Sequence, residues 1–173
     1  DALRAAGVPV WVTDIRSVPA AFPSLARMLA ACGLARPRWL AHAADRWAGL
    51  RRYGERPDFQ PVDVVVPIWR RPWMALGGDT FASDLLARLG LRNLLDGAAD
   101  RYPRLTLEEL HALRPQLVVL PDEPYAFGPS DGPEAFTGLR VALVSGRHLT
   151  WYGPRLLEAP DVLSNQLGIA SSP

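Results

Sequence analysis

Aromatic residues recur around the apolar, β-branched segments of this sequence, and they are the side chains best suited to bind a ligand. Trp69 and Trp73 follow one such segment, with Arg70 and Arg71 between them. Large rigid rings beside guanidinium groups suit a flat, partly apolar ligand that carries an anionic group. Arg70 or Arg71 is therefore a candidate partner for a ligand carboxylate or phosphate, and Arg70 is the one assigned to the site. The alternative, from residue types alone, is that the two tryptophans simply cover a sheet.

Further aromatics lie near later strand and helix patterns. They are Tyr102, Tyr125, Phe127, Trp151 and Tyr152. Open α/β sheets bind ligands outside the carboxyl ends of their strands. We therefore expect most of these aromatics to gather along one edge of one sheet.

The remaining chemistry-bearing residues favour binding over catalysis. The sequence has no glycine-rich dinucleotide fingerprint and no phosphate-binding loop. Its three histidines lie far apart in the sequence, and the adjacent Asp122 and Glu123 are expected to diverge. The lone Cys32 supports neither an internal disulfide nor a cysteine-ligated metal centre. We assign no catalytic residue, no metal ligand and no intrinsic cofactor.

Strand and helix patterns alternate along the chain and predict an α/β fold. Apolar and β-branched runs predict strands at residues 8–13, 62–67, 117–120 and 141–144. Periodicity and capping signals predict helices at residues 17–32, 36–53, 79–89, 106–113 and 156–167, the last irregular at Pro160. This order predicts a parallel-sheet lobe with helices on both faces.

Two local signals predict how neighbouring elements begin and turn. Gly77 and Gly78 are expected to supply backbone freedom. Thr106 and Glu109 have the spacing of a capping box at the start of a helix.

Composition narrows the classes of partner. A formal net charge of +1 gives no argument for binding nucleic acid or an anionic membrane. Hydrophobic residues make up 49% of the chain, which is typical of a globular protein with a core. The sequence shows no apolar run of transmembrane length and no signal peptide. Because it begins inside a helical pattern, we expect that a natural first part, including any signal peptide, is missing.

Four motifs follow one another along the chain: Ile68-Trp69-Arg70-Arg71-Pro72-Trp73-Met74-Ala75-Leu76-Gly77-Gly78-Asp79-Thr80-Phe81, Tyr102-Pro103 with Thr106-Leu107-Glu108-Glu109-Leu110, Leu120-Pro121-Asp122-Glu123-Pro124-Tyr125, and Thr150-Trp151-Tyr152-Gly153-Pro154-Arg155. In this order they resemble the periplasmic substrate-binding proteins of ABC importers for cobalamin and iron–siderophores, the helical-backbone metal receptor class. The resemblance implies two α/β lobes joined by one rigid helix. Residues 1–34 would be the end of the amino-terminal lobe, residues 35–56 the interlobe helix, and residues 57–173 the carboxyl-terminal lobe. Most of the amino-terminal lobe would then be missing.

The resemblance also implies a function and a site. The protein would capture a metal chelate (cobalamin, a ferric siderophore or haem) in an aromatic interlobe cleft and deliver it to an ABC permease. Trp73, Tyr102 and Trp151 match the family's ligand contacts, and Trp69 and Tyr152 are added as their neighbours. Glu108 matches the glutamate that docks on the permease; its alternative role is to favour the helix dipole. The expected location is periplasmic, or outside the cytoplasm on a lipid anchor.

Two other functions remain open on the same two-lobed architecture. A metal-processing enzyme would need cysteine or histidine ligands, and the single cysteine argues against it. An interaction module would cover exposed apolar surface by self-association of the truncated chain. Metal content and size in solution would distinguish these functions from ligand transport.

Overall fold

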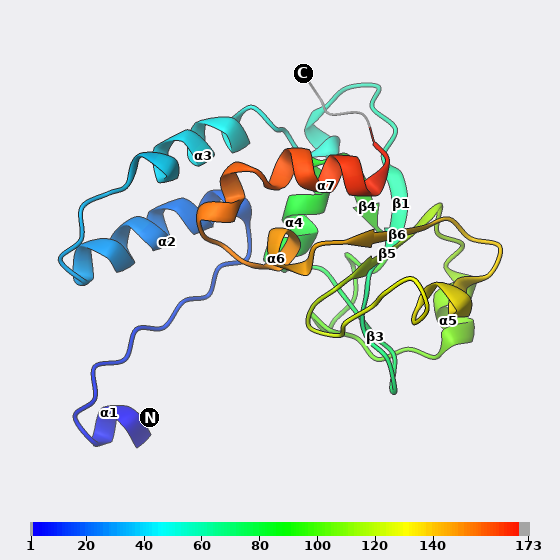
Figure 1. Ribbon diagram of the computed structural model, residues 1–173, viewed down its shortest axis with the longest axis horizontal. Coiled ribbons are helices and arrows are strands. Elements are labelled where there is room, and N and C mark those ends of the chain that lie inside the picture. Colours follow the sequence, from blue (N-terminus) through cyan, green and yellow to red (C-terminus); the bar gives the residue numbers. More distant parts are fainter. Residues whose placement is uncertain (1, 170–173) are drawn as a thin grey trace.

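A parallel sheet organises the protein in the computed structural model, which describes residues 2–169. The strands of this sheet are β1 (Val62–Val65), β4 (Leu91–Asn93), β5 (Leu117–Pro121) and β6 (Val141–Val144), in the order β4-β1-β5-β6 (Figure 1). All three pairings are parallel. The register places Val64 opposite Asn93 on one side and opposite Leu117 on the other. The predicted parallel sheet is confirmed, with β4 as a short edge strand that the sequence patterns did not reveal.

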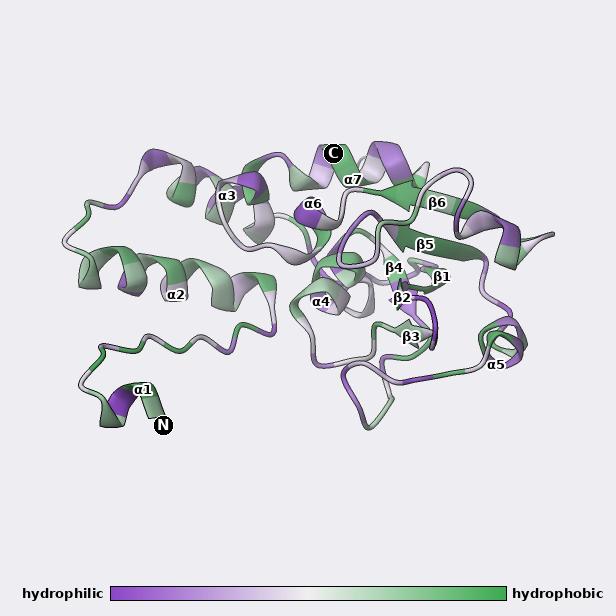
Figure 2. Cartoon of the chain, turned by 60° about the horizontal axis from the view of Figure 1, so that its bottom comes forward, coloured by the Kyte–Doolittle hydropathy of each residue, from purple (hydrophilic) through white to green (hydrophobic). Residues whose placement is uncertain are grey.

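Helices cover both faces of this sheet, as predicted. On one face, alternate strand residues such as Val64, Val119 and Val144 pack with helix α4 (Phe81–Arg88) and helix α7 (Ala159–Leu167). On the other, Val65, Val118 and Leu120 pack with helix α5 (Leu107–Ala112) and the 3-10 helix η2 (Pro133–Phe136). Strands buried on both faces carry apolar side chains at successive positions, and β5 is hydrophobic along its length in Figure 2.

Two helices lie side by side next to this unit: α2 (Val18–Ala31) and α3 (Arg38–Ala48) (Figure 1). Ser17 caps α2 as its position before the helix predicts. The helix expected at residues 36–53 is shorter than predicted, because Gly49 caps it and the next element is the 3-10 turn η1 (Tyr53–Glu55). Buried Trp47 fixes α3 to the rest of the protein by donating its indole N–H to the Leu156 carbonyl at 2.7 Å.

The strand expected at residues 8–13 is not formed. After the short helix α1 (Ala2–Ala5), this segment is extended but belongs to neither sheet of the described part (Figure 1). Val8, Trp11 and Val12 remain exposed. A β-branched run becomes a strand only when another strand satisfies its backbone hydrogen bonds, and none of the described strands lies beside it.

Local differences elsewhere shape the sheet edge. The segment after β1 is not a plain loop but an antiparallel hairpin of β2 (Pro67–Trp69) and β3 (Met74–Ala75). After β6 comes a short helix, α6 (Gly146–Thr150), then the 3-10 helix η3 (Pro154–Leu157). The helix expected at residues 156–167, irregular at Pro160, is divided in the structure: its first residues belong to η3, and α7 begins at Ala159 with Pro160 in the first turn, where proline is tolerated. Within residues 2–169, no helix combines the length and apolar character needed to span a membrane.

Candidate functional site

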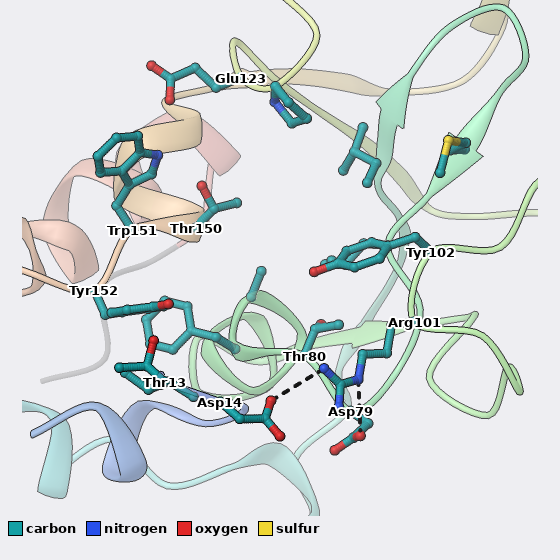
Figure 3. A pocket seen from close by; sticks show the side chains of 17 residues that line it. Thr13, Asp14, Asp79, Thr80, Arg101, Tyr102, Glu123, Thr150, Trp151 and Tyr152 are labelled. Carbon is teal, nitrogen blue, oxygen red and sulfur yellow. Dashed lines mark hydrogen bonds and ion pairs between the residues drawn. The ribbon is translucent and has the colours of Figure 1, made fainter. Parts of the chain in front are cut away.

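A pocket of about 680 Å³ opens where the connections after the parallel strands converge (Figure 3). Thr80 follows β1 and its hairpin, Tyr102 follows β4, Glu123 follows β5, and Trp151 follows β6. The extended segment before α2 closes one side through Thr13, Asp14 and Ile15. This is the sheet edge at which open α/β folds bind ligands.

Three partly exposed aromatic rings give the pocket an apolar wall. Tyr102 is 50% exposed, Trp151 62% and Tyr152 37%. Figure 3 shows Trp151 and Tyr152 on one side of the pocket and Tyr102 opposite them. The edge-on contact of Tyr152 with buried Phe81, at 5.6 Å between ring centroids, holds one ring in place. Rigid rings left open in this way can stack on a flat ligand.

A close backbone approach positions Tyr102 and its neighbour Arg101. The Gly77 N–H donates to the Arg101 carbonyl at 2.8 Å, and the Gly78 N–H donates to the Leu95 carbonyl at 3.1 Å. A Cβ on Gly77 would lie 2.4 Å from the Asp100 carbonyl oxygen, and one on Gly78 only 1.9 Å from that of Asp96. Neither glycine has a positive φ. The glycine pair therefore provides space for the neighbouring loop, not the backbone freedom expected from the sequence.

Three charged residues that line the pocket, Asp14, Asp79 and Arg101, lie together, and Arg16 contacts them from outside the lining. Arg16 donates to Asp14 and to Asp79, each at 2.6 Å. Arg101 lies 3.4 Å from the same two carboxylates (Figure 3). The pKa of Asp14 is below that of a free aspartate, chiefly because the Arg16 side chain donates hydrogen bonds to it. Because folding lowers this pKa, the stabilisation is present above about pH 4 and is lost as the pH falls through the lowered pKa.

Solved structures with the same architecture include periplasmic proteins that bind vitamin B12 or haem. The periplasmic vitamin B12-binding protein BtuF of Vibrio cholerae matches with a TM-score of 0.74 and 17% identity, over 96% of this chain and 68% of that one. The periplasmic haem-binding protein RhuT from Roseiflexus sp. RS-1 matches with a TM-score of 0.69 and 22% identity, over 96% of this chain and 69% of RhuT. A periplasmic haem-binding protein from Pseudomonas aeruginosa matches with a TM-score of 0.69 and 20% identity, over 99% of this chain and 68% of that protein. The chain has the fold of the periplasmic binding proteins.

The periplasmic-binding-protein fold expected from the sequence motifs is thereby confirmed. The chain spans a little over two thirds of the length of these three structures. No family model and no curated protein matches it by sequence. The similarity therefore lies in the three-dimensional arrangement, and the assignment of ligand and contact residues depends on the pocket itself.

In this binding-protein fold, the structure brings together only part of the predicted site. Tyr102, Trp151 and Tyr152 line the pocket, whereas Trp69, Arg70 and Trp73 do not. Trp73 instead stacks on Phe127, with ring centroids 6.1 Å apart. Trp69 packs against Tyr125 in a T-shaped arrangement, with ring centroids 5.6 Å apart. The proposed ligand contacts of Trp69 and Trp73 stay predictions, which the pocket does not support.

Alternation along the hairpin explains this placement. Trp73 and Ala75 belong to the hydrophobic cluster on the α5 face, while Met74 and Leu76 belong to the opposite cluster. Successive residues of an extended segment point to opposite faces. The pocket therefore receives Met74 and Leu76, and it takes Ile68 from the other strand of the hairpin.

Arg70 is committed to the protein's own carboxylates. It pairs with Asp131 and Glu134, and its side chain is only 16% exposed. The Tyr125 hydroxyl donates to Asp131 at 2.6 Å, and this bond is the main cause of the lowered pKa of Asp131. This network ties the loop after β5 to the hairpin. The guanidinium of Arg70 is therefore not free to pair with a ligand anion, as the sequence analysis predicted it would. The arginine that does line the pocket, and that the sequence analysis missed, is Arg101, next to Tyr102.

A serine motif in the same loop does not form a catalytic site. Residues 128–132 have the spacing Gly-x-Ser-x-Gly. They form a turn closed by reciprocal backbone hydrogen bonds between Gly128 and Asp131. A nucleophile elbow instead requires a sharp turn from a strand into a helix. Within residues 2–169, no group of three or more His, Cys, Asp or Glu side chains could hold a metal ion.

Glu108 lies on the surface, in the first turn of α5. The capping box is formed as predicted: Thr106 accepts from the Glu109 N–H at 3.1 Å, and Glu109 accepts from the Thr106 N–H at 2.7 Å. Glu108 itself has no hydrogen bond or ion pair among the described residues. Its carboxylate is therefore accessible to a partner.

Proposed function

We propose that this chain is the ligand-capturing part of an ABC importer. It binds a metal chelate, either cobalamin, a ferric siderophore or haem, and delivers it to the membrane permease. It acts outside the cytoplasm and is not an enzyme. In this proposal residues 1–34 belong to one lobe, residues 35–56 link the lobes, and residues 57–173 form the lobe that carries the pocket.

One observation supports this function most strongly: the pocket combines three partly exposed aromatic rings with the binding edge of a periplasmic-binding-protein fold. Planar or ring-containing chelates bury their apolar surface against such rings. The solved structures named above bind vitamin B12 or haem. Pocket and fold therefore point to the same class of ligand.

Tryptophan fluorescence gives a direct test, because Trp151 lines the pocket. The chain would be titrated with cobalamin, haem and a panel of ferric siderophores, with correction for absorption by these coloured ligands. Saturable quenching by one of them would support the proposal and identify the ligand. Absence of quenching by every ligand, confirmed by calorimetry on the folded chain, would refute it.

Replacing Trp151 with alanine is expected to weaken binding of that ligand by about 1–3 kcal/mol, or roughly 5–150-fold. The ring is 62% exposed in the pocket, so its removal deletes stacking surface without opening the core. Calorimetric titration would measure the change.

Trp69→Ala is the matched control, since Trp69 is a second exposed tryptophan (42%) that lies outside the pocket. Its affinity should equal that of the unaltered protein. A large loss from Trp69→Ala with none from Trp151→Ala would favour the Trp69 contact expected from the sequence and contradict the pocket.

Glu108→Gln is expected to weaken docking on the permease by roughly two- to fivefold, as for loss of one exposed ion pair. Binding to the permease in lipid nanodiscs would be measured at low and high salt, because an ionic contact is screened by salt. Glu55→Gln provides the control: Glu55 is also an exposed glutamate, but it lies on η1. Equal effects of the two substitutions would show that Glu108 has no specific role.

A further inference from the structure

The pocket contains four charged side chains, and three of them are carboxylates with close partners. Asp14 and Asp79 each accept from Arg16 at 2.6 Å, and Glu123 accepts from Arg147 at 2.8 Å. Neither Arg16 nor Arg147 lines the pocket. These two arginines therefore neutralise the three carboxylates from outside the pocket lining.

The fourth charged group, Arg101, is held differently. Its Nη1 lies 3.4 Å from Asp14, and its Nε lies 3.4 Å from Asp79. N–H···O hydrogen bonds normally span about 2.7–3.2 Å, so both contacts are weak. A guanidinium has five N–H donors, and the Arg101 side chain is 39% exposed. Arg101 is the one cation lining the described pocket, and its hydrogen-bonding capacity is largely unused.

The backbone from which this side chain extends is nevertheless held in place. The Arg101 carbonyl accepts from the Gly77 N–H at 2.8 Å, inside the close contact that only glycine permits. The next residue, Tyr102, forms one aromatic wall of the pocket (Figure 3). A ligand whose ring system lies between Tyr102 and Trp151 would therefore bring its periphery within reach of Arg101.

We propose that Arg101 binds a free carboxylate of the cargo, so that the pocket selects a carboxylate-bearing chelate. This inference rests on the proposed function and narrows its ligand class. A planar guanidinium matches a carboxylate with two parallel hydrogen bonds, which an ammonium group does not provide. Haem and siderophores with free carboxylates fit this requirement, and chelates whose side chains are neutral amides or esters do not.

Iron protoporphyrin IX and its dimethyl ester form the sharpest pair of probes, because they differ only in the two carboxylates. They would be titrated in the same dilute detergent, beside cobalamin and ferric siderophores with and without free carboxylates. The tightest ligand is expected to carry a free carboxylate. Arg101→Gln should weaken it about 10–100-fold, as expected for loss of a charged hydrogen-bonding partner, and should leave binding of neutral analogues unchanged.

Two further variants separate local recognition from general charge. Arg104→Gln removes the same charge from the same loop outside the pocket, so affinity should change less than about twofold, as for an exposed charge. Asp14→Asn removes a carboxylate that competes for Arg101, so affinity for the carboxylate ligand should rise. Circular dichroism of each variant would establish that the fold is intact.

The outcomes separate this inference from the proposed function. If the tightest ligand has no free carboxylate, or if Arg101→Gln leaves a carboxylate ligand bound as tightly, the role of Arg101 is refuted while chelate binding stands. If Arg104→Gln weakens binding as much as Arg101→Gln, the effect is long-range charge and the inference again fails. If no chelate binds the unaltered protein, both the function and the inference fail.

Discussion

Replacing Asp84 with alanine is expected to lower the free energy of unfolding by about 3–5 kcal/mol, because it leaves buried partners uncompensated. The Asp84 side chain is 6% exposed and accepts hydrogen bonds from three separate segments. The Val18 N–H donates at 2.8 Å, Arg88 at 2.9 Å and Arg52 at 2.7 Å. Asp84 thus joins the start of α2, the segment after α3, and α4.

The charge and the helix end both contribute to this effect. Val18 is the first residue of α2, and the first N–H groups of a helix have no partner within the helix. A carboxylate there also meets the positive end of the helix dipole. Arg88 is only 13% exposed, so its charge would lose its main partner without gaining full hydration.

Urea unfolding followed by circular dichroism would measure the loss. Asp161→Ala is the control, since Asp161 is 56% exposed and pairs with Arg46 at the surface. An exposed pair contributes up to about 1 kcal/mol. A similar small loss for both variants would show that Asp84 does not hold the three segments together.

Gly78→Ala is expected to destabilise the protein by about 1–3 kcal/mol or more, the usual result of forcing atoms into a packed region. The added Cβ would lie 1.9 Å from the Asp96 carbonyl oxygen, so the backbone of one segment must move. The loop that moves carries Arg101 and Tyr102, and ligand affinity should therefore fall together with stability. Thermal unfolding and ligand titration of the same variant would measure both changes.

Gly97→Ala is a close control for this prediction. Gly97 follows Asp96 in the sequence and does not have a positive φ, and a Cβ added to it would meet no atom within 4 Å. This substitution should leave unfolding and ligand binding nearly unchanged. If Gly78→Ala behaved like Gly97→Ala, the close approach would not be what positions the pocket.

Local sequence patterns determined much of the fold. Apolar runs identified β1, β5 and β6, and the Thr106–Glu109 capping box marked the start of α5. The N-cap Ser17 falls where the helix signals predict it. These features depend on neighbours in the chain, through hydrogen bonds within one turn or alternation along one strand, so the sequence is sufficient to reveal them. It also indicated that aromatics following strands meet at one edge, as Tyr102, Trp151 and Tyr152 do.

Only the tertiary structure decided which side chains enter the pocket and which stay outside it. Trp73 and Met74 are adjacent, and a shift of one residue in an extended segment reverses the face. Arg70 and Arg101 are both arginines beside aromatics, but Arg70 meets Asp131 from a loop about sixty residues away along the chain. The run at residues 8–13 has strand-forming residues but no strand beside it in the described part. These features depend on contacts between segments that are distant in the sequence and meet only in the folded chain. Local sequence patterns therefore cannot predict them.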